Sequence, residues 1–223
     1  MNVRSKSWFW IVAVAAGFAL AAAVIVVCGK FPVGIRFSPP QLGMPDAATN
    51  GMDIVVAARS QIGVTVKYDS SYRSIPYPNG DVPKDRGVCS DVVVRALRDA
   101  RDMDLQKLVH EDMTSNFLFY PSFTRWFLFG PDANIDHRRV LNLERYFGRM
   151  GWSLRVDHNV DSYLPGDLVT CLIGGDLPHI MIVSDAKTTN GTPLVIHNIG
   201  LGAREEDRLF SYEISGHHRL PKK

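Results

Sequence analysis

The sequence is poor in the residues that build cross-linked or zinc-bound proteins. It has only three cysteines in 223 residues, at positions 28, 89 and 171. An odd count with no repeating spacing predicts neither a disulfide framework nor a zinc cage. A Cys89–Cys171 disulfide is an alternative in an oxidising compartment, but it would consume a thiol that the rest of the sequence marks as reactive.

An excess of charge of one sign is also absent. The 25 Lys and Arg residues face 23 Asp and Glu residues, which gives a net charge of +2, and the basic residues are scattered among acids. This pattern predicts no nucleic-acid partner. The His-Glu-x-x-His spacing of metalloproteases is missing as well, because in His110-Glu111-Asp112 adjacent side chains point in different directions. We therefore expect no metal and no cofactor.

One long uncharged run is present, at residues 8–28, with Arg4 and Lys6 before it and Lys30 after it. A helix of this length spans roughly 31 Å, which matches a hydrocarbon core of about 30 Å. The apolar region of a signal peptide is shorter, about 7–15 residues. Residues 1–30 are therefore predicted to be a signal-anchor, with a cleaved signal peptide as the alternative.

The basic residues before this run favour an orientation with the N-terminus in the cytoplasm. The remaining chain would then face the periplasm, either held by a single span in a bacterial inner membrane or secreted after cleavage. Residues 31–51 are rich in proline and glycine and are predicted to be a tether. Residues 52–223 are long enough for one domain with a full core.

Within this domain, helical periodicity comes first and strand-like runs follow. Helices are expected near residues 53–61, 89–101, 104–116 and 141–150, and strands near 152–156, 168–173, 179–183, 194–198 and 209–213. This order predicts an α+β fold in which N-terminal helices pack on an antiparallel sheet. The aromatic-rich segment 117–129 is interpreted as core or a cleft wall, with a membrane-facing patch as the alternative.

The stretch 87–97 contains the candidate nucleophile. Cys89 opens a helix whose apolar positions recur at three- and four-residue spacing, and the charged positions of that helix fall on its other side: Arg95, Arg98, Asp99 and Arg101. The free N–H groups at a helix start carry about half a positive charge and lower the pKa of a thiol from about 8.5 towards neutrality. The pattern predicts a thiolate. The alternative is a small apolar core residue.

Two histidines can supply the base and the group that orients it. His179 begins one predicted strand, and His197 lies near the end of the next, after an Asn190-Gly191 turn. If the strands pair antiparallel, His179 meets His197 or Asn198. Alternation puts His197 and Asn198 on opposite faces, so only one can orient His179, and the register leaves the choice open.

These motifs resemble a known family, the NlpC-type cell-wall peptidases. The resemblance rests on a cysteine at a helix start followed by Pro165-Gly166-Asp167-Leu168-Val169, then Pro-His-Ile-x-Ile-Val at 178–183 and Val-Ile-His-Asn at 195–198. Such proteins are papain-like hydrolases that cleave the peptide stems of peptidoglycan. Segments 75–83, 104–113 and 134–139 are similar to an uncharacterised bacterial family related to that superfamily, the domain of unknown function 1287. The resemblance spans roughly residues 52–220.

The resemblance implies a papain-like fold with Cys89 as nucleophile, His179 as general base and His197 as the orienting group. It also implies a tyrosine near the nucleophile, for which Tyr77 is the candidate and Tyr68 the rival.

Two further points concern the charged residues. The usual Asp-Cys-Ser-Gly motif is replaced here by Val88-Cys89-Ser90-Asp91, so an acid stands where a small residue is expected. Asp136 and Arg138 lie in a charged loop, and an arginine there could hold a substrate carboxylate.

The predicted function is that of an extracytoplasmic cysteine hydrolase that cuts an amide bond in peptidoglycan or a similar peptide. Three alternatives stay open. One is a metal-dependent amidase that uses His110, His137, His179 or His197. Another is a cell-wall-binding module without turnover. The third keeps the nucleophile but transfers the acyl group to an amine or lipid instead of water.

Overall fold

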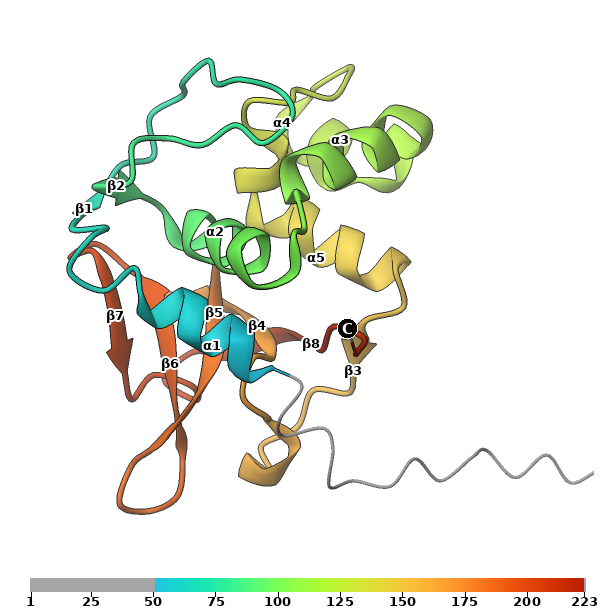
Figure 1. Ribbon diagram of the computed structural model, residues 1–223. Helices are drawn as coiled ribbons and strands as arrows, with labels where there is room; N and C mark the ends of the chain where they lie inside the picture. The colour runs from blue at the N-terminus through green and yellow to red at the C-terminus, as the bar shows by residue number, and fades with distance from the viewer. Residues whose placement is uncertain (1–50, 223) are drawn as a thin grey trace, which may run out of the picture. The chain divides into compact units, whose positions relative to one another are not determined.

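Helices and a sheet form two layers in residues 51–222, the part of the chain that the computed structural model describes (Figure 1). The helices are α1 (Met52–Arg59), α2 (Cys89–Arg101), α3 (Leu105–Asn116), α4 (Pro121–Trp126) and α5 (Val140–Arg149), with short 3-10 turns η1 (Phe117–Phe119), η2 (Asp136–Arg138) and η3 (Val160–Ser162). The strands are β1 (Lys67–Tyr68), β2 (Arg86–Gly87), β3 (Ser153–Leu154), β4 (Leu168–Ile173), β5 (Leu177–Lys187), β6 (Pro193–Asn198), β7 (Ala203–Glu206) and β8 (Glu213–His218).

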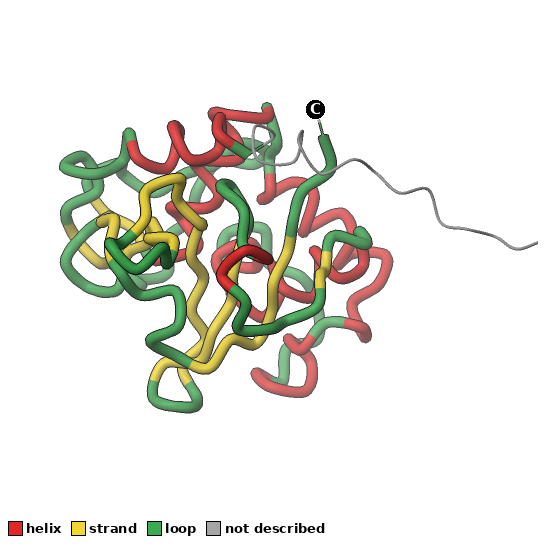
Figure 2. Tube along the Cα trace, turned by 90° about the horizontal axis from the view of Figure 1, so that it is seen from below, coloured by secondary structure: helices red, strands yellow, loops and turns green. Residues whose placement is uncertain are grey.

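Strands β3 to β8 form one antiparallel sheet in the order β3-β8-β4-β5-β6-β7. Helices α1, α2 and α5 contact it, and α3 and α4 pack outside them. Viewed from below, the longer helices gather on one side of the sheet, with mainly loops on the other (Figure 2). The predicted α+β class, with helices on an antiparallel sheet, is confirmed.

The sheet buries apolar side chains on both faces because successive residues of a strand point in opposite directions. Ile180 and Ile182 of β5 belong to the core shared with the helices, whereas Met181 and Val183 belong to a second cluster with Tyr163. Strand β5 is therefore anchored from both sides. This anchoring gives the residues at its ends a rigid support.

Helix α2 begins at Cys89, as predicted, and ends at Arg101. Arg95, which the periodicity places on the side opposite the apolar stripe, is nevertheless only 5% exposed. Its guanidinium donates to both carboxylate oxygens of Asp81 and to the carbonyl of Val82. The loop before β2 folds across this side of α2 and covers what periodicity alone marks as the polar face.

Three other expectations differ from the structure. Strand β7 was not predicted, and the predicted strand at 209–213 is a turn from which only Glu213 enters β8. The segment 117–129 was expected in the core or a cleft wall, with a membrane-facing patch as the alternative. It forms η1, α4 and a loop with several exposed phenylalanines, so it is not part of the core.

The predicted membrane anchor at 8–28, and all but the last residue of the predicted tether, lie outside the described residues. Within residues 51–222, none of the helices combines the length and the apolar character that a membrane span requires.

Candidate active site

The Cys89 thiol lies where the start of α2 meets strand β5. Cys89 is 4% exposed, and its sulfur accepts hydrogen bonds from the backbone N–H groups of Ile180, Ser90 and Cys89 itself. Ile180 directly follows His179 on β5. The helix start therefore places the candidate nucleophile against the strand that carries the candidate base.

The state of this thiol differs from the prediction. Burial is the main reason that the pKa of Cys89 rises to about 11, and the negative charge of Asp91 acts in the same direction. The three backbone N–H groups lower the pKa, but they do not offset the loss of water. The expected thiolate is therefore wrong for the resting site, which holds a neutral thiol at pH 7.

His179 and His197 meet as the predicted hairpin requires. Strands β5 and β6 pair with Ile182 opposite Ile196, and this register brings His179 Nε2 to 2.7 Å from His197 Nδ1. Asn198, the other candidate partner, points away and donates from Nδ2 to the Gly87 carbonyl at 2.9 Å. The structure thus selects His197 as the neighbour of His179, and Asn198 ties the end of β6 to the strand that leads into Cys89.

A carboxylate that the sequence did not reveal extends this pair. Glu206 Oε2, on β7, lies 3.2 Å from His197 Nε2. A carboxylate only accepts hydrogen bonds, so His197 donates from Nε2 and its Nδ1 must accept the proton of His179 Nε2–H. This order leaves Nδ1 of His179 as the nitrogen with a free lone pair, which is the form that a general base requires.

Burial keeps both rings neutral. It lowers the pKa of His179 to about 3, and the neighbouring His197 acts in the same direction. Burial also lowers the pKa of His197, against the opposing effect of Glu206. At pH 7 the site therefore contains a neutral thiol and two neutral imidazoles.

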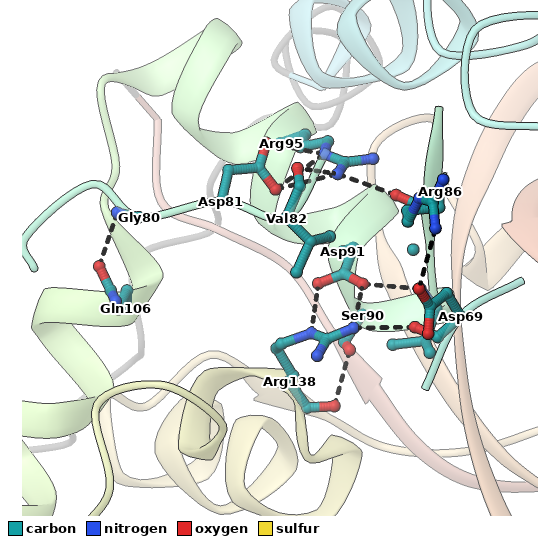
Figure 3. Close-up of polar contacts among 12 residues, drawn as sticks. Asp69, Gly80, Asp81, Val82, Arg86, Ser90, Asp91, Arg95, Gln106 and Arg138 are labelled. Atoms are coloured by element: carbon teal, nitrogen blue, oxygen red, sulfur yellow. Dashed lines mark hydrogen bonds and ion pairs between the residues drawn. The ribbon is translucent and has the colours of Figure 1, made fainter. Parts of the chain in front are cut away.

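Asp91 has a structural explanation, which Figure 3 shows. Its Oδ2 accepts the Val88 N–H at 2.6 Å, and Arg138 forms a two-pronged ion pair with it, Nε to Oδ1 at 2.9 Å and Nη2 to Oδ2 at 3.0 Å. Both side chains are less than 5% exposed. A Cβ on Gly87 would come within 2.9 Å of Asp91 Cβ, so the glycine makes room for this cap.

Arg138 is therefore not available to a substrate carboxylate, contrary to the prediction. It also donates to the carbonyls of Asp69 and Ser71, and its own carbonyl accepts the Ser90 hydroxyl at 2.7 Å. These contacts connect the first turn of α2 to the loop after β1 (Figure 3). Arg138 thus holds the first turn of α2, which begins with Cys89, against the loop after β1.

Asp136 is likewise committed inside the protein. It is 1% exposed, receives Arg139 Nη1 at 3.0 Å and accepts the backbone N–H of Asp132. Burial raises the pKa of its carboxyl. The predicted substrate-binding role of Asp136 is thus not supported by its surroundings, which fold the loop around η2.

Tyr68, rather than Tyr77, is the tyrosine beside the thiol. Tyr68 lies in β1 opposite Gly87, and the pKa of its hydroxyl is raised by burial and by its neighbours Cys89 and Asp91. Tyr77 instead packs its ring edge-on against His110 of α3, with 5.2 Å between ring centroids. The prediction favoured Tyr77 because of its spacing in the chain, and the parallel pairing of β1 with β2 reverses that choice.

The four histidines that were considered as metal ligands do not form a common site. Of the four histidines considered for a metal-dependent amidase, His179 and His197 bond to each other, whereas His110 packs on Tyr77 and His137 is buried in η2. Within residues 51–222, no group of three or more His, Cys, Asp and Glu residues could hold a metal ion. Cys89 and Cys171 are both free thiols.

Taken together, these features define an α+β protein in which a buried cysteine at a helix start adjoins a His-His-Glu chain. Residues 55–220 match the family described as Domain of unknown function (DUF1287), and the chain belongs to this family. It is 52% identical over 181 residues to "Uncharacterized protein YijF" of Escherichia coli (strain K12), an alignment that covers 81% of this chain and 86% of that protein. No solved structure matches the chain.

Proposed function

We propose that this protein is a cysteine hydrolase with a papain-like, NlpC-type arrangement that cleaves an amide bond in peptidoglycan stem peptides. One observation carries the proposal. A chain of hydrogen bonds from Glu206 through His197 orients His179, the residue beside the Ile180 N–H that contacts the Cys89 sulfur. Nucleophile, base and orienting group are the parts that acyl transfer by a thiol requires.

The neutral resting site determines the first step. As the Cys89 sulfur attacks the carbonyl carbon of the amide, its proton passes to Nδ1 of His179, and the resulting imidazolium is stabilised through His197 by the Glu206 carboxylate. Backbone N–H groups at the start of α2 can hold the carbonyl oxygen as it gains charge. His179 then protonates the leaving amine, and water attacks the thioester to release the acid and restore the thiol.

The substrate class is supported by the position that the sequence predicts for the domain. A span at residues 8–28 with its N-terminus in the cytoplasm would put residues 51–222 in the periplasm of a bacterium, where peptidoglycan stems offer exposed amides. Tyr68 is 44% exposed and adjoins the thiol, so it can line the entry for such a peptide.

The burial of Cys89 favours a second candidate, a wall-binding module without turnover. A thiol that is 4% exposed and has a pKa of about 11 is poorly accessible to a substrate and is not ionised at pH 7. Such a module would bind peptidoglycan but release no fragments from it. The two candidates therefore differ in one measurable outcome.

Digestion of purified peptidoglycan by the full chain, followed by mass spectrometry of the released muropeptides, tests the proposal. We expect fragments cut at one type of amide, and their loss in Cys89→Ala. Cys171→Ala is the matched control, because Cys171 is also a buried free thiol but lies in the apolar cluster on the other face of the sheet. Equal turnover by Cys89→Ala and the wild type, or no fragments from either, would contradict the proposal.

A further inference from the structure

The segment between α3 and η2 exposes an unusual amount of apolar surface. Five large apolar side chains within twelve residues face solvent and form what we call the aromatic face: Leu118 (77% exposed), Phe119 (63%), Phe123 (41%), Phe127 (78%) and Phe129 (88%). Single exposed apolar residues are common on protein surfaces, but five of them within twelve residues concentrate apolar surface in one segment, as interaction sites do.

Hydrogen bonds from buried side chains fix the backbone of the segment that carries the aromatic face. Tyr120 and Ser122 are buried, and their hydroxyls donate to Asp112 Oδ2 at 2.6 Å and to Asn142 Oδ1 at 3.1 Å. Phe123 and Phe129 contact each other edge-to-face, with 6.1 Å between centroids. The phenylalanines are thus presented outwards by a segment whose backbone is anchored to α3 and α5.

The only charge within the segment that carries the aromatic face is positive. Residues 117–130 contain no acid, and their single basic residue, Arg125, is exposed. Arg149 lies over the ring of Phe119 at 5.4 Å from its centroid, but its guanidinium is paired with Asp112, so Arg125 is the charge that faces a partner. Phenylalanine and leucine beside arginine is the composition that enters the boundary between lipid headgroups and acyl chains.

The position of the segment at the edge of the domain also favours a lipid bilayer over a protein as the partner. The chain after α4 runs to the outer edge of the domain in Figure 1, away from the sheet. Side chains on such a projection can insert into lipid, whereas a stable protein interface needs a broad complementary surface of about 800 Å² per partner.

The tether length permits contact with a membrane. Roughly 22 residues separate the predicted span at 8–28 from Gly51, and a chain of that length reaches at most about 70 Å. A domain of this size is roughly 40 Å across. A domain anchored through residues 8–28 can therefore turn either end towards the bilayer that holds it.

We propose that the aromatic face inserts into the headgroup region of an anionic phospholipid bilayer and fixes the orientation of the domain on the membrane. The contact needs no catalytic residue, so it holds whether or not the protein is a hydrolase. It limits the motion that a flexible tether would allow, and it presents the Cys89 site at a defined height above the membrane.

Photo-crosslinking of the full chain in vesicles of phosphatidylethanolamine and phosphatidylglycerol tests this proposal. The photoreactive residue p-benzoylphenylalanine replaces Phe127 in one variant and Val56 in the control. Val56 is 60% exposed on α1, which directly follows the tether, so this control position is close in sequence to the predicted anchor. We expect about tenfold more lipid adducts from position 127, measured by mass spectrometry of the peptides.

A second experiment tests the role of the phenylalanines with the photoreactive residue at another position. Phe127→Ser with Phe129→Ser changes only exposed side chains, and a probe at Phe123 should then lose most of its lipid adducts while circular dichroism stays unchanged. Equal lipid adducts at positions 127 and 56 would overturn the proposal. Adducts that join two copies of the chain at position 127 would also overturn it, in favour of a dimer interface.

Discussion

At the scale of single residues, burial decides the state of the candidate nucleophile. The start of α2 supplies backbone N–H groups to the Cys89 sulfur, yet the pKa of the thiol rises to about 11 because the site excludes water. The pKa of His179 falls to about 3 for the same reason. Both shifts favour a neutral pair, so in the proposed reaction the proton would leave Cys89 during the attack and not before it.

The rate at which iodoacetamide modifies Cys89 should therefore depend steeply on pH. Only the thiolate reacts, so the rate should rise about tenfold per pH unit from pH ~7 towards the pKa of about 11. Mass spectrometry of the alkylated peptides measures it. Cys171 is a built-in control, because burial raises its pKa to about 12 and it is fully buried. A rate that is constant between pH ~6 and ~8 would show a preformed thiolate and refute the neutral pair.

The local sequence pattern was sufficient to predict those site residues that are recognisable from a single helix or hairpin. Cys89 was found from a helix start, and one hairpin predicted that His179 meets His197 or Asn198, a choice that the strand register decides in favour of His197. Glu206 and Tyr68 were harder, because their places depend on how β7 and β1 pair with other strands. Arg138 could be predicted only as a charge in a loop, since nothing near it in sequence shows that Asp91 is its partner.

At the scale of elements, the first turn of α2 depends on one buried ion pair. Asp91 caps the helix through the Val88 N–H and neutralises Arg138. An acid in the first turn also complements the helix dipole. The acid that departs from the usual Asp-Cys-Ser-Gly motif thus contributes to the helix start and to the loop that Arg138 holds.

Asp91→Asn should destabilise the protein by about 3–5 kcal/mol, because it leaves the Arg138 guanidinium buried beside a neutral amide. Urea unfolding followed by fluorescence measures the free energy of unfolding. The matched control is Asp99→Asn on the same helix, where the side chain is exposed and the change should stay within about 0.5 kcal/mol. Equal effects of the two substitutions would show that the ion pair contributes no more than a surface charge.

Element prediction was accurate where hydrophobic periodicity is undisturbed. Strand β4 has its predicted bounds, and α2 begins at its predicted residue. Strand β7 was missed because its sequence, Ala-Arg-Glu-Glu, lacks apolar alternation, which an edge strand does not need. Leu209 suggested a strand because it is apolar. It lies in a turn, however, and its side chain is buried in the cluster that also contains Tyr163.

At the scale of the whole molecule, the domain buries several neutral histidines. Burial is the main cause that lowers the pKa of four of them: it lowers that of His137 to about 4, that of His179 to about 3 and that of His218 to about 4, and it also lowers that of His197. They lie in η2, β5, β6 and β8. Acid sensitivity is therefore spread through the fold and is not confined to the candidate active site.

The free energy of unfolding should fall as the pH drops from about 6.5 to about 4. In this window the unfolded chain, whose histidines have a pKa near 6.5, binds protons that the folded chain does not bind, so acid favours unfolding. Each such histidine contributes a slope of up to about 1.4 kcal/mol per pH unit. Burial raises the pKa of Asp136 and Glu144, and these two carboxyls oppose the trend only where they begin to take up protons.

Urea titrations at several pH values between about 7 and 4 measure this slope. The three histidines with the lowest pKa values together predict up to about 4 kcal/mol per pH unit, and a domain of ordinary stability, about 5–15 kcal/mol, would then unfold near the lower end of the window. His137→Gln should flatten the slope by about a third, because it removes one of the three groups while leaving the candidate active site intact. A free energy that stays constant from pH ~7 to ~5 would mean that the buried rings gain protons in the folded state as readily as in the unfolded chain.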